Sequence, residues 1–227
     1  MVNVLDKGEI TLIDSMGGDI SVVAAARVSN AVTYEEASRG EEKDAKLIKF
    51  LARNRHGTPF EHATFTFRVK APLFVVREWQ RHRMGSYNEV SGRYVEFNPE
   101  FYYPNLWRVP GKTNKQGSAV PMPFDQGWQD EAHLSYADAM QEAYARYVFL
   151  IEHGVAKEMA RMLLPLSLYT EFYWTVNARS LMNFISLRSA EDAQWEIRQY
   201  GIALKRLFRE RMPLTYAAFE ENGFIAP

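Results

Sequence analysis

The stretch Thr64-Phe65-Thr66-Phe67-Arg68-Val69 alternates polar and apolar side chains. A period of two over a run rich in Thr, Phe and Val predicts a β-strand with one buried face. Pro72 follows and opens an apolar stripe, Leu73, Val76 and Trp79, at helical spacing. This stretch therefore predicts a strand that leads directly into an amphipathic helix.

The chain before this stretch contains two further helical patterns. Residues 10–13 read as a short strand, and Asp19 is the predicted N-cap of a helix through residues 22–26. Residues 41–55 carry an apolar stripe that predicts a helix, which Gly57 is expected to end.

The chain after it is predicted to be largely helical. The expected helices run from Asp130 to Gly154, over 155–164, over 170–187 and over 190–211, the last with a capping box at 189–192. Strands come early and helices late, which is typical of an α+β fold. No boundary divides the pattern, so residues 1–227 are expected to form one domain.

Residues 97–128 separate the two regions and contain five prolines, among them Pro121 and Pro123, and three glycines. The composition predicts a long irregular excursion, and loops of that length often carry function.

Composition excludes several classes of protein. The chain has 227 residues, 27 Lys+Arg against 28 Asp+Glu, and no Cys. The absence of Cys excludes disulfides, thiolate zinc sites and a cysteine nucleophile. The near-neutral charge argues against a surface that binds nucleic acid throughout. No apolar run reaches 18 residues, and Asp6 and Lys7 interrupt the first ten, where a signal peptide would need an apolar run. We therefore expect a cytoplasmic protein without a membrane span.

The densest polar constellation lies between Arg81 and Tyr94. Arg81, His82 and Arg83 fall near the expected end of the helix at Gly85, and a loop rich in hydrogen-bonding groups follows. Guanidinium groups bind phosphate bidentately, so this stretch could hold a phosphorylated planar ligand. Alternatively, the cations simply favour a helix C-terminus.

Two more polar clusters accompany it. One runs from Glu158 to Arg161 and continues in the polar residues of an otherwise apolar stretch, Asn177, Arg179, Asn183 and Arg188. Such groups need partners when buried, either within the core or from a ligand. The other spans residues 53–62, where the histidine spacing argues against a metal site. Neither a Gly-rich dinucleotide fingerprint nor a P-loop is present.

The order and spacing of these clusters resemble those of the flavin-dependent thymidylate synthases, the ThyX family. Arg81-His82-Arg83, then seven residues, then Ser91 resembles the family signature. Residues 56–62 resemble the segment before it. The segments that resemble the family's C-terminal half are Ala160-Arg161 with Leu164-Pro165, residues 177–183, Leu187-Arg188 and residues 193–196. The resemblance covers nearly the whole chain.

The resemblance implies reductive methylation of dUMP to dTMP, with methylenetetrahydrofolate as carbon donor, NADPH as reductant and FAD as the bound flavin. It implies an α+β domain in which a mixed β-sheet is flanked by helices, with a helical C-terminal half. It also implies a homotetramer with active sites between subunits, small-molecule substrates, and no nucleic-acid or membrane partner.

The resemblance also implies roles for individual residues. The expected dUMP contacts are Glu78, Gln80, Arg81, Glu89, Ser91, Gly92, Arg93, Arg161 and Arg188. The expected FAD contacts are Ser29, His56, Thr58, Glu61, Arg81, His82, Arg83, Glu89, Asn177, Arg179 and Asn183. Arg188 is the expected catalytic residue, which polarises the uracil, because a guanidinium stabilises a developing oxyanion.

One departure from the family stands at Glu78, where some members carry Gln. A carboxylate would repel a phosphate, so we expect Glu78 to orient Arg81, three residues on. The proline-rich segment 108–123 has no counterpart that we can map.

Two other interpretations of the function stay open. One is a single-stranded nucleic-acid-binding module that uses Arg and aromatic side chains. The other is a flavoenzyme with another reaction, such as a nucleotide-dependent oxidase.

Overall fold

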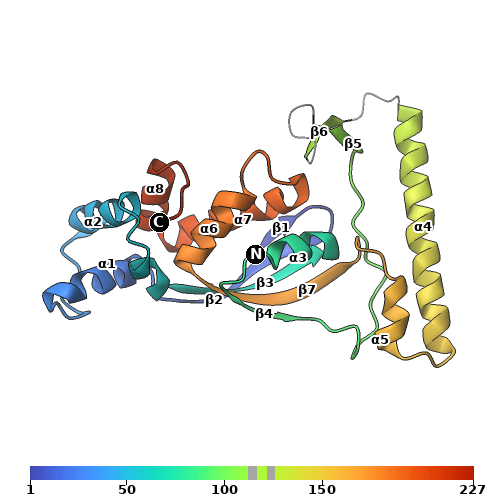
Figure 1. Ribbon diagram of the computed structural model, residues 1–227, viewed down its shortest axis with the longest axis horizontal. Helices are drawn as coiled ribbons and strands as arrows, with labels where there is room; N and C mark the ends of the chain where they lie inside the picture. Colours follow the sequence, from blue (N-terminus) through green and yellow to red (C-terminus); the bar gives the residue numbers. More distant parts are fainter. Residues whose placement is uncertain (112–116, 122–125) are drawn as a thin grey trace.

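The computed structural model is built around a five-stranded sheet in the order β1-β2-β3-β7-β4 (Figure 1). It describes residues 1–111, 117–121 and 126–227; the predicted chain breaker Pro123 lies outside these ranges. Each neighbouring pair of strands in this sheet is antiparallel. The fold class α+β is thus confirmed, but the expected mixed sheet is wrong, because hairpins and long excursions return each strand antiparallel to its neighbour.

The strands of the sheet are β1 (Val2–Val4), β2 (Gly8–Met16), β3 (Thr64–Pro72), β4 (Ser86–Glu89) and β7 (Tyr169–Asn177). A separate hairpin pairs β5 (Arg108–Pro110) with β6 (Ser118–Pro121). The helices are α1 (Asp19–Arg27), α2 (Glu41–Arg53), α3 (Leu73–Trp79), α4 (Gln126–Glu152), α5 (Lys157–Ala160), α6 (Ala178–Arg188), α7 (Trp195–Arg211) and α8 (Pro213–Glu221). Short 3₁₀ turns are η1 (Val28–Asn30), η2 (Thr58–His62) and η3 (Arg161–Leu163).

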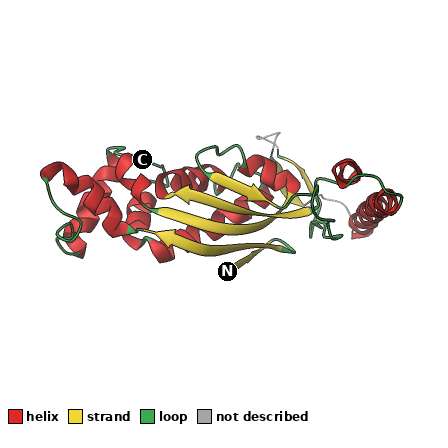
Figure 2. Cartoon of the chain, turned by 90° about the horizontal axis from the view of Figure 1, so that it is seen from below, coloured by secondary structure: helices red, strands yellow, loops and turns green. Residues whose placement is uncertain are grey.

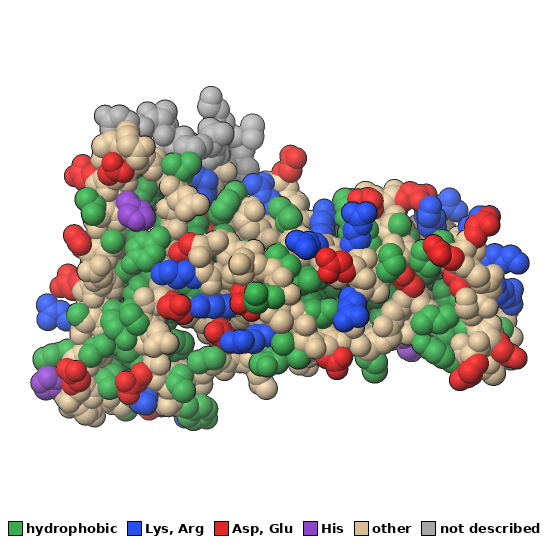
Figure 3. Space-filling view, turned by 180° about the vertical axis from the view of Figure 1, so that it is seen from behind, with side chains coloured by type: hydrophobic (Ala, Val, Ile, Leu, Met, Phe, Trp, Pro, Cys, Tyr) green, Lys and Arg blue, Asp and Glu red, His purple; other side chains and the backbone are tan. Residues whose placement is uncertain are grey.

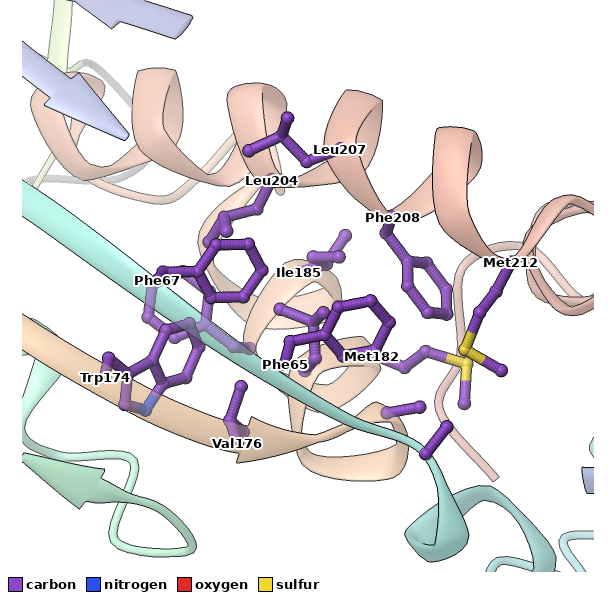
Figure 4. Packing of buried hydrophobic residues seen from close by; sticks show 14 of the residues in the cluster. Phe65, Phe67, Trp174, Val176, Met182, Ile185, Leu204, Leu207, Phe208 and Met212 are labelled. Carbon is purple, nitrogen blue, oxygen red and sulfur yellow. The ribbon is translucent and has the colours of Figure 1, made fainter. Parts of the chain in front are cut away.

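The pairing of β3 with β7 forms the centre of the core. On the buried face Phe65 lies opposite Val176, and Phe67 lies opposite Trp174. Helices α6 and α7 cover this face with Met182, Ile185, Leu204, Leu207 and Phe208 (Figure 4). The predicted alternation of β3 is therefore confirmed, and it exists because only one face of the sheet meets helices.

The other face of the sheet is open (Figure 2). Thr66 and Thr175 are hydrogen-bonded there at 3.0 Å, and Arg68 is paired with Glu171. The expected helices therefore lie on one face and at the ends of the sheet.

Seen from behind, Lys/Arg and Asp/Glu side chains are interspersed over the body of the molecule (Figure 3). The side of the molecule seen in this view has no continuous basic stripe.

Helix α4 stands apart from the body (Figure 1). Tyrosines attach it to the chain before the hairpin, since Tyr136 donates to the Tyr102 carbonyl and Tyr144 to the Phe97 carbonyl. Of its 27 residues only Gln129 and Tyr147 are buried, and Leu134 and Phe149 are 64% and 51% exposed. The predicted apolar stripe is thus only partly covered within one chain.

No helix in the described ranges combines the length and apolarity that a membrane span requires.

The predicted helix over 170–187 is wrong in its first half. Residues 169–177 form β7, and only residues 178–188 form a helix. Residues 169–176 are mostly aromatic or β-branched, and such residues favour strands. They bury alternate side chains, with Phe172, Trp174 and Val176 facing the helices and Tyr173 half exposed.

Several predicted helix ends also differ from the structure. The helix after Pro72 ends at Trp79 rather than near Gly85, and the last long helix begins at Trp195, so the predicted capping box is not used. Gly57 does not end α2; Arg55 takes the left-handed conformation there, at φ 57°. A Cβ atom on Gly57 would lie 2.3 Å from Nε of Arg179, so a larger residue there would displace the Arg179 side chain.

The prediction that Asp19 caps its own helix is wrong. Asp19 instead caps the start of α8. Its carboxylate accepts hydrogen bonds from the backbone N–H groups of Leu214 and Thr215, at 2.9 and 2.8 Å, and from the Thr215 hydroxyl at 2.6 Å. Gly18 occupies the N-cap position of α1 instead. One carboxylate thus ties the first helix to the last.

Substitution Asp19→Ala should destabilise the fold by about 1–3 kcal/mol, because it leaves the donors of the buried Thr215 without their acceptor. Urea unfolding followed by circular dichroism measures this change. The matched variant Asp14→Ala removes an exposed carboxylate that accepts from the adjacent Ser15 N–H, and equal losses in the two variants would contradict the capping role.

Candidate active site

An open pocket of about 660 Å³ lies where β7 passes into α6. Its walls include Glu61, Arg81, His82, Arg83, Arg179, Asn183 and Arg188. The structure thus brings together seven predicted site residues from three distant segments. They meet because β3 leads toward the 81–83 turn, while its neighbour β7 leads into α6.

Arg188 is the most constrained cation of this pocket. Its Nε donates to Nε2 of His82 at 3.0 Å, its Nη1 to the Glu78 carboxylate at 3.0 Å, and its Nη2 to the Glu78 carbonyl at 3.2 Å. Its side chain is only 21% exposed. Residues in the described part of the chain therefore engage three of the five guanidinium N–H groups and leave two for a ligand.

His82 accepts a hydrogen bond from Arg188 and must therefore be unprotonated at Nε2. Burial, assisted by the positive charge of Arg188, lowers the pKa of His82 to about 4. A neutral imidazole is consequently expected at physiological pH. Its ring packs on Phe184, with 4.6 Å between ring centroids, and its carbonyl accepts from the Tyr87 hydroxyl at 2.7 Å.

The other cations of the pocket are more exposed. Arg179 is paired with Glu61 at 2.7 Å and also donates to the Pro227 carbonyl. Within the described ranges, Arg81 and Arg83 form no ion pair with the protein and both are exposed. Three guanidinium groups at one pocket suit a ligand with several phosphate charges, such as a dinucleotide cofactor.

A second pocket, of about 320 Å³, contains four of the predicted dUMP contacts. Glu89, Ser91, Gly92 and Arg161 line it. A Cβ atom on Gly92 would come within 2.5 Å of the Phe97 ring and 3.2 Å of Cδ of Arg161, so only glycine fits there without rearrangement. Arg93 lies beside this pocket, paired with Glu158 at 3.5 Å.

The two pockets lie at opposite ends of β7. Leu168, just before the strand, lines the second pocket, and Val176, near its end, lines the first. At about 3.3 Å per strand residue these positions are roughly 26 Å apart. The nearest lining residues are closer, since Glu89 of the second pocket lies opposite Phe172, two positions from Trp174 of the first. The predicted dUMP contacts are thus divided between two neighbouring pockets.

Other predicted residues lie elsewhere. Ser29, His56 and Thr58 are exposed and line neither pocket. Asn177 is the N-cap of α6, accepting from the Ser180 N–H at 2.8 Å. Gln80 donates to Glu89, which links the turn to the second pocket.

Glu78 does not orient Arg81 as predicted but pairs with Arg188. Residue spacing could not reveal this contact, because the two residues are 110 positions apart and meet only through tertiary structure. Met84, Ser180 and Leu187 also line the first pocket and are not among the predicted site residues. Their proximity to predicted residues was the one available signal.

Comparison with known proteins decides the family. The family model described as "Thymidylate synthase complementing protein" matches residues 11–214. A flavin-dependent thymidylate synthase of Thermotoga neapolitana is 50% identical over 223 residues, which cover 98% of this chain and 95% of that protein. One from Thermus thermophilus is 49% identical over 97% of this chain and 78% of its own length.

The chain belongs to the flavin-dependent thymidylate synthase family.

Solved structures agree with this assignment. The UMP/dUMP methylase PolB of Streptomyces cacaoi, bound with 5-Br dUMP, superposes with a TM-score of 0.88 at 36% identity, over all of both chains. The prediction that the chain is an enzyme of the flavin-dependent thymidylate synthase family is thereby confirmed. The roles of its individual residues stay predictions.

Protonation of His82 should lower the stability of this family member in acid. The unfolded state binds a proton on this histidine below its ordinary pKa of 6.5, whereas the folded state does so only near 4. The free energy of unfolding should therefore fall as pH decreases from 6.5 toward 4. His82→Gln keeps an acceptor for Arg188 but does not titrate, so it should flatten this dependence.

Denaturant unfolding at pH 7 and pH 5 tests this expectation. The variant His153→Gln, at the exposed end of α4, controls for loss of any histidine. If the free energy of unfolding of His82→Gln depended on pH as strongly as that of the wild type, His82 would not be held neutral in the folded protein.

Proposed function

We propose that this enzyme converts dUMP to dTMP by reductive methylation, with FAD as its flavin, methylenetetrahydrofolate as carbon donor and NADPH as reductant. Membership of the family and the similarity to a dUMP methylase support dTMP synthesis. The chain contains no Cys, so carbon transfer cannot proceed through a cysteine adduct of this chain. We also propose that the enzyme is cytoplasmic.

The observation that carries the proposal is Arg188, held between a neutral histidine and a carboxylate at the edge of a cationic pocket. A fixed guanidinium with two free N–H groups suits the O4 and N3 edge of a uracil ring. There it would stabilise negative charge that develops when C5 acts as nucleophile. Fixing the donor beforehand avoids reorganisation during the reaction.

The residues of the first pocket fit a flavin dinucleotide. Arg81, Arg83 and Arg179 would hold the diphosphate of FAD, and Asn183 offers a neutral amide to a ring or ribose. When bound, the flavin supplies the hydride that completes the methyl group. A neutral His82 does not repel the Arg188 guanidinium, so the hydrogen bond that holds Arg188 in position is maintained.

The residues of the second pocket fit the nucleotide phosphate. Arg161 and the Ser91 hydroxyl offer donors, and Gly92 allows close approach of the backbone. Because the predicted dUMP contacts are divided between the two pockets, we propose that the second pocket of one subunit completes the first pocket of another. The homotetramer implied by the family would supply this arrangement.

The exposed apolar side chains outside the sheet agree with such an assembly. Leu134, Phe149 and Met162 are 64%, 51% and 75% exposed. Hydrophobic side chains are visible on the α4 arm in Figure 3. Apolar surface of this kind is commonly covered at a subunit interface.

The direct test is formation of dTMP from dUMP by purified enzyme supplied with FAD, methylenetetrahydrofolate and NADPH. Chromatographic detection of dTMP that depends on all of these components supports the proposal. Oxidation of NADPH without dTMP would instead favour a nucleotide-dependent oxidase. A protein that retains no flavin but binds oligonucleotides in a salt-sensitive manner would favour the nucleic-acid-binding module.

Arg188→Ala should retain FAD but lower turnover by about 100-fold or more, because it removes a donor to charge that develops in the transition state. Flavin absorbance and initial rates of dTMP formation measure the two effects. Arg81→Ala, in contrast, should weaken binding of both FAD and dUMP. Normal turnover by Arg188→Ala would remove this residue from the mechanism.

Mixing two inactive variants tests whether the sites lie between subunits. Arg161→Ala damages only the second pocket and Arg188→Ala only the first. If the two pockets of one site come from different subunits, co-refolded or co-expressed mixtures regain activity at about a quarter of their sites. Mixtures as inactive as either variant alone would show that each subunit forms its own site.

A further inference from the structure

Glu78 lies on a rigid element next to the first pocket. It is the penultimate residue of α3, and its neighbours Val76 and Trp79 are fully buried against the sheet and α7. Arg188 is the last residue of α6. Two helix ends that are packed on the same core therefore set the distance between the Glu78 carboxylate and the Arg188 guanidinium.

The contact between them uses both the side chain and the main chain of Glu78. Its Oε2 accepts from Nη1 of Arg188 at 3.0 Å, and its carbonyl accepts from Nη2 at 3.2 Å. With the His82 contact at Nε, three acceptors lie along three nitrogens of one planar group. Such a set fixes both the position and the plane of a guanidinium.

Only one of these acceptors carries charge. His82 is neutral, and within the described ranges Glu78 is the single anion that forms an ion pair with Arg188. The two side chains are 29% and 21% exposed, so water screens the pair only in part. Without Glu78, the half-buried guanidinium would lack a counter-ion on the protein.

A second carboxylate nearby does not serve this purpose. Glu196 of α7 is 3% exposed and is already paired with Arg108 and hydrogen-bonded to Tyr102 and Gln194. Its charge acts on Glu78 from α7, while that of Arg188 acts from α6. Arg108, in the hairpin whose role the sequence left open, thus neutralises the competing anion.

We infer that Glu78 is a positioning residue, which orients the Arg188 guanidinium so that its two free N–H groups face the pyrimidine. This inference rests on the proposed methylation of a uracil nucleotide. It assigns Glu78 to the arginine and not to the nucleotide phosphate, which a carboxylate would repel. The same contact is available to a glutamine, which offers a neutral acceptor of similar length.

The variants Glu78→Ala and Glu78→Gln test this role. Glu78→Ala should lower kcat for dTMP formation by about ten- to a hundredfold, as expected for a displaced catalytic group. Glu78→Gln should recover part of this loss. Binding of dUMP to flavin-free protein, measured by calorimetry, should change less than about threefold. Unchanged kcat in both variants, or clearly tighter dUMP binding in both, would overturn the inference.

A readout without turnover makes the test independent of the proposed reaction. Phenylglyoxal modifies accessible arginines, and mass spectrometry of the peptide that contains Arg188 gives its modification rate. Release of the guanidinium should increase this rate several-fold in Glu78→Ala, with a smaller increase in Glu78→Gln. Equal rates in wild type and Glu78→Ala would overturn the inference even if the enzyme made no dTMP.

Two controls separate positioning from general effects. Glu210→Ala removes an exposed carboxylate paired with Arg206 on α7 and should change neither kcat nor the modification of Arg188. In an Arg188→Ala background, Glu78→Ala should cost no further activity, because the two residues act as a unit. Additive losses would show that Glu78 acts independently of Arg188. Failure of wild-type enzyme to form dTMP would count against the proposed function instead.

Discussion

The antiparallel pairing of β3 with β7 is the constraint on which the site depends. Nine residue pairs, from Thr64 opposite Asn177 to Pro72 opposite Tyr169, align the two strands without a shift. One strand leads through α3 to the 81–83 turn, and the other begins α6. A slip of one residue would turn Phe67 or Trp174 to the open face, so burial of these rings fixes the register and brings His82 to Arg188.

The electrostatics of the site follow from this packing. Burial keeps His82 neutral, and a neutral imidazole can accept a hydrogen bond from Arg188 where an imidazolium would repel it. The carboxylate of Glu78 balances the guanidinium, and the exposed Arg81 and Arg83 are left to a ligand. The pocket thus has one cation that the protein fixes and others that binding would neutralise.

The sequence predicted the local patterns better than the connections between them. The alternation at 64–69 identified β3 correctly, and the clusters around Arg81 and Arg188 identified the walls of the first pocket. The run at 169–176 is a strand that the pattern does not reveal, because three consecutive aromatic residues, 172–174, interrupt the alternation of polar and apolar side chains. The antiparallel sheet and the Asp19 cap of α8 depend on residues far apart in the chain.

The same limit applies to the site. The positions matched to the family signature do lie at pockets, but in two groups that line two separate pockets. Spacing along the chain cannot tell whether such groups meet within one subunit or between two. The partner of Glu78 was missed for a related reason, since spacing favoured Arg81 and the tertiary fold provided Arg188.

The central claim is that flavin and uracil nucleotide share one cationic pocket beside Arg188. The visible absorption spectrum of protein loaded with FAD and freed of excess, recorded during a dUMP titration, tests it most directly. The account predicts retained flavin whose bands shift saturably as dUMP binds. Protein that retains no flavin, or flavin whose spectrum does not respond to dUMP, would contradict it.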